Sequence, residues 1–101
     1  MIEICNLRKE KAIFPYDFRV DRFSVIGNPF MMGNEKDRDF VCNKYEIWFY
    51  ENVKKPEIQD YLNKMHKAYF EFGAIRLFCW CTPKRCHAET IKRYLEEKIG
   101  C

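Results

Sequence analysis

A short apolar run, residues 74–81, constrains the fold of this chain more than any other segment. The run reads Ala-Ile-Arg-Leu-Phe-Cys-Trp-Cys and carries a single charge, which is typical of a strand that is covered on both faces. Amphipathic patterns on either side predict helices over 56–72 and 88–99, each ended by a glycine, Gly73 and Gly100. A buried strand between two helices indicates an α/β fold in which this strand is central.

The rest of the chain supplies two further predicted strands and a third helix. Residues 2–7 and 16–20 alternate between apolar and polar side chains, as half-buried strands do. Apolar side chains spaced by three and four residues predict a helix over 37–53, and residues 23–26 form a further brief β-favouring run. We therefore expect a small three-layer α-β-α sandwich with a short mixed or parallel sheet and about three helices.

Length and composition define the class of protein. A chain of 101 residues that is 48% hydrophobic and 33% charged forms one domain, residues 1–101, with a single core, and it is too apolar for disorder. The net charge of +3, with both signs interspersed, argues against broad nucleic-acid binding. The sequence shows neither a membrane-spanning run nor a signal peptide. We expect a cytoplasmic protein without a membrane partner, and a homo-oligomer is compatible with the sequence.

Three cysteines and a histidine crowd into residues 79–87, namely Cys79, Cys81, Cys86 and His87. The last two begin a predicted helix, where free N–H groups and the helix dipole favour anions and lower thiol pKa values. Cys86 or Cys81 is therefore a candidate nucleophile, and His87 is the candidate acid or base. The simpler interpretation is that the thiols are small buried hydrophobic groups.

Zinc is an alternative ligand for this cluster, with Cys79, Cys81, Cys86 and His87 as its candidate ligands. The spacing argues against it, because one residue separates Cys79 from Cys81, and the adjacent Cys86 and His87 would struggle to reach the same ion. We predict no cofactor, and a zinc-stapled structural module stays an alternative. Without an export signal we expect all six cysteines to be reduced, and the sequence assigns no role to Cys5, Cys42 and Cys101.

A second unusual loop, Gly27-Asn28-Pro29-Phe30, follows the predicted strand region near residue 20. Ligands of open α/β sheets bind beyond the carboxyl ends of the strands, so we expect this loop and residues 81–87 to share a cleft. The backbone of Gly27 and Asn28 allows a ligand to approach closely.

Basic side chains near both loops suit an anionic ligand. Lys84 and Arg85 precede the predicted helix start, and Arg22 and Arg38 can each form two hydrogen bonds to a phosphate. Exposed salt bridges are the simpler role for Arg22 and Arg38.

The two motifs together resemble a small uncharacterised family of bacterial, archaeal and phage proteins, marked by a GNPF-type loop and a CWC-x4-CH segment. The resemblance spans about residues 19–97. Its last part also resembles, more distantly, the carboxyl end of another uncharacterised bacterial family. Neither resemblance implies a known activity, but the first implies a site at the matched positions, which are Arg22, Ser24, Gly27, Asn28, Pro29, Phe30, Arg38, Cys79, Trp80, Cys81, Cys86 and His87.

The sequence thus predicts a small protein that binds a nucleotide-like or other phosphorylated small molecule between the two loops. The candidate ligand-binding residues are Arg22, Ser24, Gly27, Asn28, Pro29, Phe30, Arg38, Lys84 and Arg85. Whether chemistry follows is left open. A non-enzymatic, phage-type protein that sequesters a nucleotide or blocks a host protein is an alternative.

Overall fold

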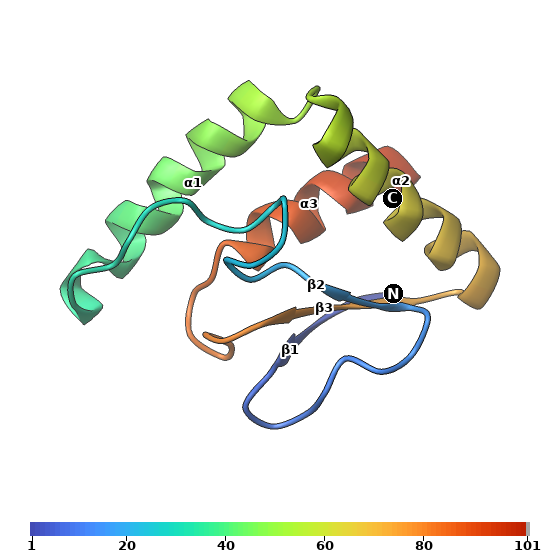
Figure 1. Cartoon of the computed structure of the whole chain (residues 1–101), viewed down its shortest axis with the longest axis horizontal. Coiled ribbons are helices and arrows are strands. Elements are labelled where there is room, and N and C mark those ends of the chain that lie inside the picture. Colours follow the sequence, from blue (N-terminus) through green and yellow to red (C-terminus); the bar gives the residue numbers. More distant parts are fainter. Residues whose placement is uncertain (101) are drawn as a thin grey trace.

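The apolar run of residues 74–81 contains the central strand of the sheet. The computed structural model, which describes residues 1–100, has the strand order β1-β3-β2, and β3 pairs in parallel with both neighbours (Figure 1). The strands are β1 (Ile2–Asn6), β2 (Asp17–Arg19) and β3 (Ile75–Cys79). The prediction of an α/β fold with a parallel sheet and this central strand is confirmed.

Three helices pack on the sheet, as predicted, and local signals set their bounds. They are α1 (Arg38–Asn52), α2 (Pro56–Phe72) and α3 (Ala88–Ile99), and a short 3-10 turn, η1 (Glu35–Asp37), precedes α1. Pro56 begins α2, where its missing N–H leaves no hydrogen bond unmade. Gly73 and Gly100 end α2 and α3 with φ of 78° and 87°, a left-handed conformation that favours glycine.

One core joins the helices to one side of the sheet. Side chains alternate along a strand, so Ile75, Leu77 and Cys79 share that side. They pack with buried side chains from all three helices, among them Tyr45, Phe49, Leu62, Met65, Ile91 and Leu95. Figure 1 shows the helices above the strands, consistent with this single core.

The loop between β1 and β2 covers the other side of the sheet. On this side the Arg76 guanidinium lies 5.0 Å from the centre of the buried Phe78 ring and 5.5 Å from that of Phe14. Arg76 also pairs with Asp17 at 2.8 Å and with Glu10 at 2.7 Å. Irregular chain therefore forms the third layer of the α/β architecture, and the ion pairs of Arg76 hold it against the sheet.

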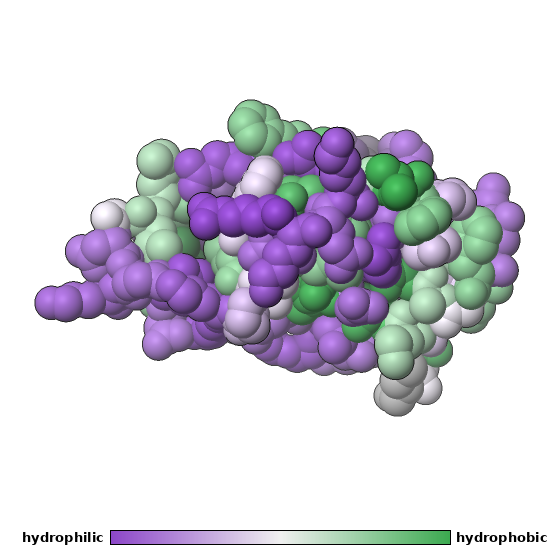
Figure 2. Space-filling view, turned by 90° about the horizontal axis from the view of Figure 1, so that it is seen from below, coloured by the Kyte–Doolittle hydropathy of each residue, from purple (hydrophilic) through white to green (hydrophobic). Residues whose placement is uncertain are grey.

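The surface beneath the sheet is largely hydrophilic (Figure 2). This agrees with the position of Arg76, Glu10 and Asp17 on that side. No helix within residues 1–100 has the length and apolar character that crossing a bilayer requires.

Residues 23–26 form turns and not a strand, although their composition favours β-structure. The N–H of Ser24 donates to the carbonyl oxygen of Asp21 at 2.9 Å, and the N–H of Gly27 donates to that of Ser24 at 3.1 Å. The fully buried side chains of Val20 and Ile26 anchor both ends of this segment in the core. The chain therefore folds back on itself immediately after β2.

Candidate functional site

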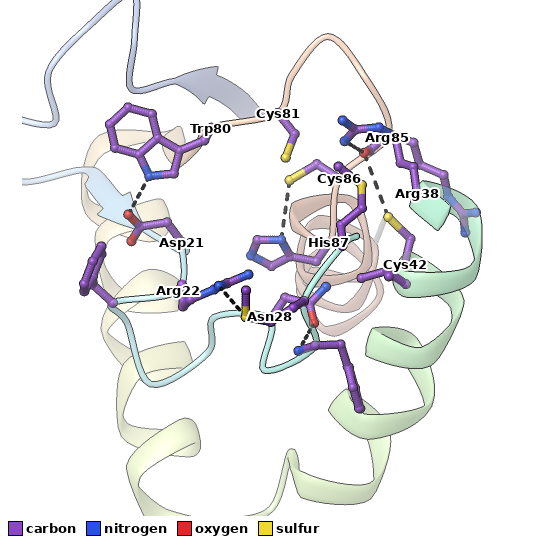
Figure 3. A pocket seen from close by; sticks show the side chains of 15 residues that line it. Asp21, Arg22, Asn28, Arg38, Cys42, Trp80, Cys81, Arg85, Cys86 and His87 are labelled. Atoms are coloured by element: carbon purple, nitrogen blue, oxygen red, sulfur yellow. Dashed lines mark hydrogen bonds between the residues drawn. The ribbon is translucent and has the colours of Figure 1, made fainter. Parts of the chain in front are cut away.

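A cavity of about 540 Å³ opens where β2 and β3 end (Figure 3). Its lining comes from the loop after β2, the first turns of α1 and the segment between β3 and α3. Cavities of roughly 300–1,000 Å³ are typical of small-molecule sites. The structure thus brings the two loops to one place, because the carboxyl ends of parallel strands lie at the same edge of a sheet.

Most of the candidate site residues line this cavity. Those that do are Arg22, Asn28, Phe30, Arg38, Cys81, Arg85, Cys86 and His87. The cavity lining does not include Ser24, Gly27, Pro29 and Lys84. The residues of the first group can contact a molecule in the cavity, whereas those of the second group belong to the loops outside the lining.

Gly27 makes its close approach to the chain itself and not to the cavity. A β-carbon on Gly27 would lie 2.2 Å from the carbonyl oxygen of Asp21 and 2.7 Å from the Cα of Arg22. Ser24 braces the same turn, since its Oγ donates to the Asp21 carbonyl at 2.9 Å. These two residues therefore hold the wall that carries Arg22, and the expected contact of Gly27 with a ligand is replaced by a contact within the loop.

Three of the four candidate cations are already paired. Lys84 Nζ lies 2.6 Å from Glu35 Oε1, and Arg38 Nη2 lies 2.6 Å from Glu35 Oε2. Arg85 Nη1 lies 3.0 Å from Asp39 Oδ1. These pairs reduce the positive charge that the three side chains offer to an anion.

Arg22 has no ion-pair partner among residues 1–100. The one side-chain hydrogen bond of its guanidinium in that range runs from Nη1 to Met31 Sδ, at 3.5 Å, and thioether sulfur is a weak acceptor. Arg22 is thus the cavity cation whose donors are free for a ligand.

Groups of the chain itself occupy the start of α3. The N–H of Cys86 donates to Glu89 Oε2 at 3.1 Å, and the backbone of Ala88 hydrogen-bonds the Cys86 thiol. These contacts use two of the backbone groups at this helix terminus, and Lys84 and Arg85 are paired elsewhere, so little of the terminus is left for an anion.

His87 is largely buried in the cavity wall, and its hydrogen bonds define its tautomer. Its Nε2 is hydrogen-bonded to the carbonyl oxygen of Val20, which can only accept, so Nε2 carries the proton of the neutral ring. Nδ1 is then an acceptor and lies 3.5 Å from Cys86 Sγ. Burial lowers the pKa of His87, which keeps the ring neutral near pH 7.

The thiols of Cys79, Cys81 and Cys86 lie together, but only Cys81 is partly exposed. Hydrogen bonds from Cys86 and from the Arg38 guanidinium lower the pKa of Cys81 below its ordinary 9.0. Hydrogen bonding to Cys79 and Cys81, together with burial, raises that of Cys86. The Arg38 guanidinium thus favours the thiolate form of Cys81, whereas Cys86 stays a thiol.

Asp21 is a cavity residue that the sequence analysis missed. Its side chain is 2% exposed and accepts hydrogen bonds from Trp80 Nε1 at 2.9 Å and from Arg19 Nε at 3.3 Å. Burial opposes its ionisation, but the bonds from Arg19 and Trp80 hold the pKa of Asp21 below 3.8. The carboxylate thus fixes the indole of Trp80, which is 44% exposed at the cavity wall. Its signal in the sequence is an acidic residue immediately beyond the carboxyl end of a strand.

One family of proteins matches residues 5–97 of the chain. The chain belongs to this family, which is described as a domain of unknown function (DUF4326). The DUF4326 match begins at residue 5, earlier than the resemblance over about residues 19–97, and it contains both loops that line the cavity. No curated protein and no solved structure matches the chain.

The described part of this DUF4326 domain, residues 1–100, contains no group of three His, Cys, Asp or Glu side chains placed to hold a metal ion. The two ring nitrogens of His87 face Val20 and Cys86. The zinc ligand set of Cys79, Cys81, Cys86 and His87 is therefore not assembled.

The remaining cysteines of the DUF4326 domain differ in their surroundings. Cys42 is buried and lines the cavity, with Sγ 3.9 Å from the carbonyl oxygen of Arg85. Cys5 is buried elsewhere, and burial raises its pKa to about 12. Both are free thiols. Cys101 lies outside the described residues.

Proposed function

We propose that this protein binds a small molecule that joins an anionic group such as a phosphate to a planar ring, as a nucleotide does, in the cavity between the two loops. The observation that carries the proposal is that a free guanidinium and an indole line the same cavity. Arg22 has free guanidinium donors, and Trp80 presents an indole held by Asp21. A guanidinium matches the oxygens of a phosphate, and an indole offers a face on which a base can stack.

The remaining lining supports a ligand with these two parts. Arg22, Arg38 and Arg85 outnumber the one carboxylate, that of Asp21, so the lining favours an anion even though two of the arginines are paired. Phe23 is 87% exposed at the rim, where it adds apolar surface for a ring.

Tryptophan fluorescence tests the proposal directly. The chain has two tryptophans, Trp48 and Trp80, so a Trp48→Phe variant keeps the indole at the cavity as its reporter. Titration with AMP, ATP and inorganic phosphate should give saturable quenching, with the nucleotides binding more tightly than phosphate alone.

Substitution of Arg22 supplies the matched comparison. Arg22→Met removes a charge-assisted contact worth about 1.5–3 kcal/mol, so it should weaken nucleotide binding by roughly 10- to 100-fold. Arg93→Met is the control, because Arg93 pairs with Glu46 away from the cavity. The absence of saturable quenching, or equal affinities of the two variants, would refute the proposal. Chromatography of the incubated nucleotide then separates a binding protein, which returns it unchanged, from an enzyme.

A further inference from the structure

We propose that Cys81 and Cys86 form a redox-active dithiol that exchanges with low-molecular-weight disulfides such as oxidised glutathione. Three neighbouring groups lie in the cavity wall, and Figure 3 shows their order: the Cys81 thiol, the Cys86 thiol and the His87 ring. The proposal does not rest on nucleotide binding.

The two thiols differ in access and face each other. Cys81 is half-buried in the cavity wall, whereas Cys86 is 3% exposed. Their sulfur atoms point toward each other in Figure 3. An attacking disulfide therefore meets Cys81 first and finds Cys86 directly behind it.

Arg38 prepares Cys81 for attack. Its guanidinium hydrogen-bonds the Cys81 thiol, and it is held in place by the carbonyl oxygen of Arg85 at 3.0 Å and by Glu35. A cation in contact with a thiol favours the thiolate, which is the nucleophilic form. A low-pKa, accessible thiolate beside a second thiol is the arrangement found in redox-active cysteines.

Two exchange steps follow from this geometry. In the first, the Cys81 thiolate attacks one sulfur of oxidised glutathione, whose S–S bond breaks, so that Cys81 is joined to one glutathione and the other leaves as a thiolate. In the second, Cys86 gives its proton to His87 Nδ1 and its thiolate attacks the Cys81 sulfur. The Cys81–Cys86 bond forms and the second glutathione leaves as a thiolate. The protein thus loses two electrons, and the oxidised glutathione gains them.

His87 is suited to the second step because its Nε2 already bonds the Val20 carbonyl oxygen, which leaves Nδ1 to accept a proton. Nε2–H donates to the Val20 carbonyl, so the lone pair of Nδ1 faces Cys86 Sγ at 3.5 Å. Removal of this base should slow the second step by about 100-fold or more.

Mass spectrometry of the reduced full chain, incubated with oxidised glutathione and then digested, tests the proposal. The wild-type chain should yield a peptide linked through Cys81 and Cys86 and no lasting glutathione adduct. Cys86→Ala should accumulate the adduct on Cys81, and His87→Gln should accumulate it transiently. Cys81→Ser should form neither product. Cys5→Ser, which alters a thiol outside the cavity, should behave like the wild type.

Opposite outcomes overturn the proposal. They are a wild-type chain that keeps a stable adduct, a Cys81→Ser variant that is oxidised as fast as the wild type, or a linked peptide that lacks Cys81 or Cys86. The adduct on Cys86→Ala needs no resolving thiol, so it tests the first step even if a substitution at His87 prevents folding. Far-ultraviolet circular dichroism of each variant identifies those that fold.

Discussion

Gly27→Ala places a methyl group where the chain has no room for it. The new β-carbon would lie 2.2 Å from the carbonyl oxygen of Asp21, 2.7 Å from the Cα of Arg22 and 2.8 Å from the carbonyl carbon of Asp21. All three are backbone atoms, which cannot rotate away as a side chain can. The turn that joins residues 21 and 27 through Ser24 must therefore open.

The size of the effect follows from this contact. Overpacking typically costs about 1–3 kcal/mol. We expect the upper end, about 3 kcal/mol, since relief of the contact disturbs two turn hydrogen bonds. A loss of 1 kcal/mol shifts the melting temperature of a domain of this size by about 4–8 °C, so Gly27→Ala should lower it by about 12–24 °C.

Thermal unfolding followed by circular dichroism measures this loss, with Gly33→Ala as the matched control. A β-carbon on Gly33 would meet only the Oδ2 atom of Asp37, at 3.3 Å, and that side chain can move. Its expected change is within about 0.5 kcal/mol. The reasoning is refuted if the two alanine variants melt within about 4 °C of each other.

Three further predictions concern charge and protonation. Arg76→Met removes the ion-pair partner of Asp17, whose side chain is 1% exposed, and should lower the free energy of unfolding by about 3 kcal/mol. Arg93→Met breaks an exposed ion pair and should lower the free energy of unfolding by less than about 1 kcal/mol. Equal losses of the two variants in urea titrations would contradict this. Burial lowers the pKa of His66, so the folded chain binds its proton less readily than the unfolded chain, and stability should fall as the pH drops below about 6.5. His66→Leu should make the urea midpoint depend less on pH below about 6.5. The same pH dependence in the variant and the wild type would disprove the role of His66. Alkylation of Cys81 by iodoacetamide should reach its maximal rate at a lower pH in the folded chain than in urea, because its pKa is lowered, and coincident pH profiles would count against the thiolate.

The helices and the central strand could be predicted because local chemistry decides them. Pro56, Gly73 and Gly100 mark helix ends through their own backbone preferences, whatever surrounds them. The β-favouring residues 23–26 form turns because Gly27 lets the chain close onto Asp21, a tertiary contact that no local propensity contains.

That the two loops share one cavity could be predicted, but the electrostatics of that cavity could not. Strand ends of a parallel sheet converge, which places Asn28 and His87 on one cavity. The pairing of Lys84 with Glu35 joins residues 49 positions apart, so it depends on how η1 packs beside the β3–α3 loop. For the same reason the sequence could not show that Arg22, among several arginines, keeps its donors free.

The rim of the cavity contributes little to the stability of the fold. Phe23 and Met31 are 87% and 75% exposed, so substitutions there remove little buried surface and leave the core intact. Gly27, in the same loop, tolerates no added atom. Substitutions at the rim can therefore reshape the cavity without loss of the fold, whereas the turn beneath has no space for a larger residue.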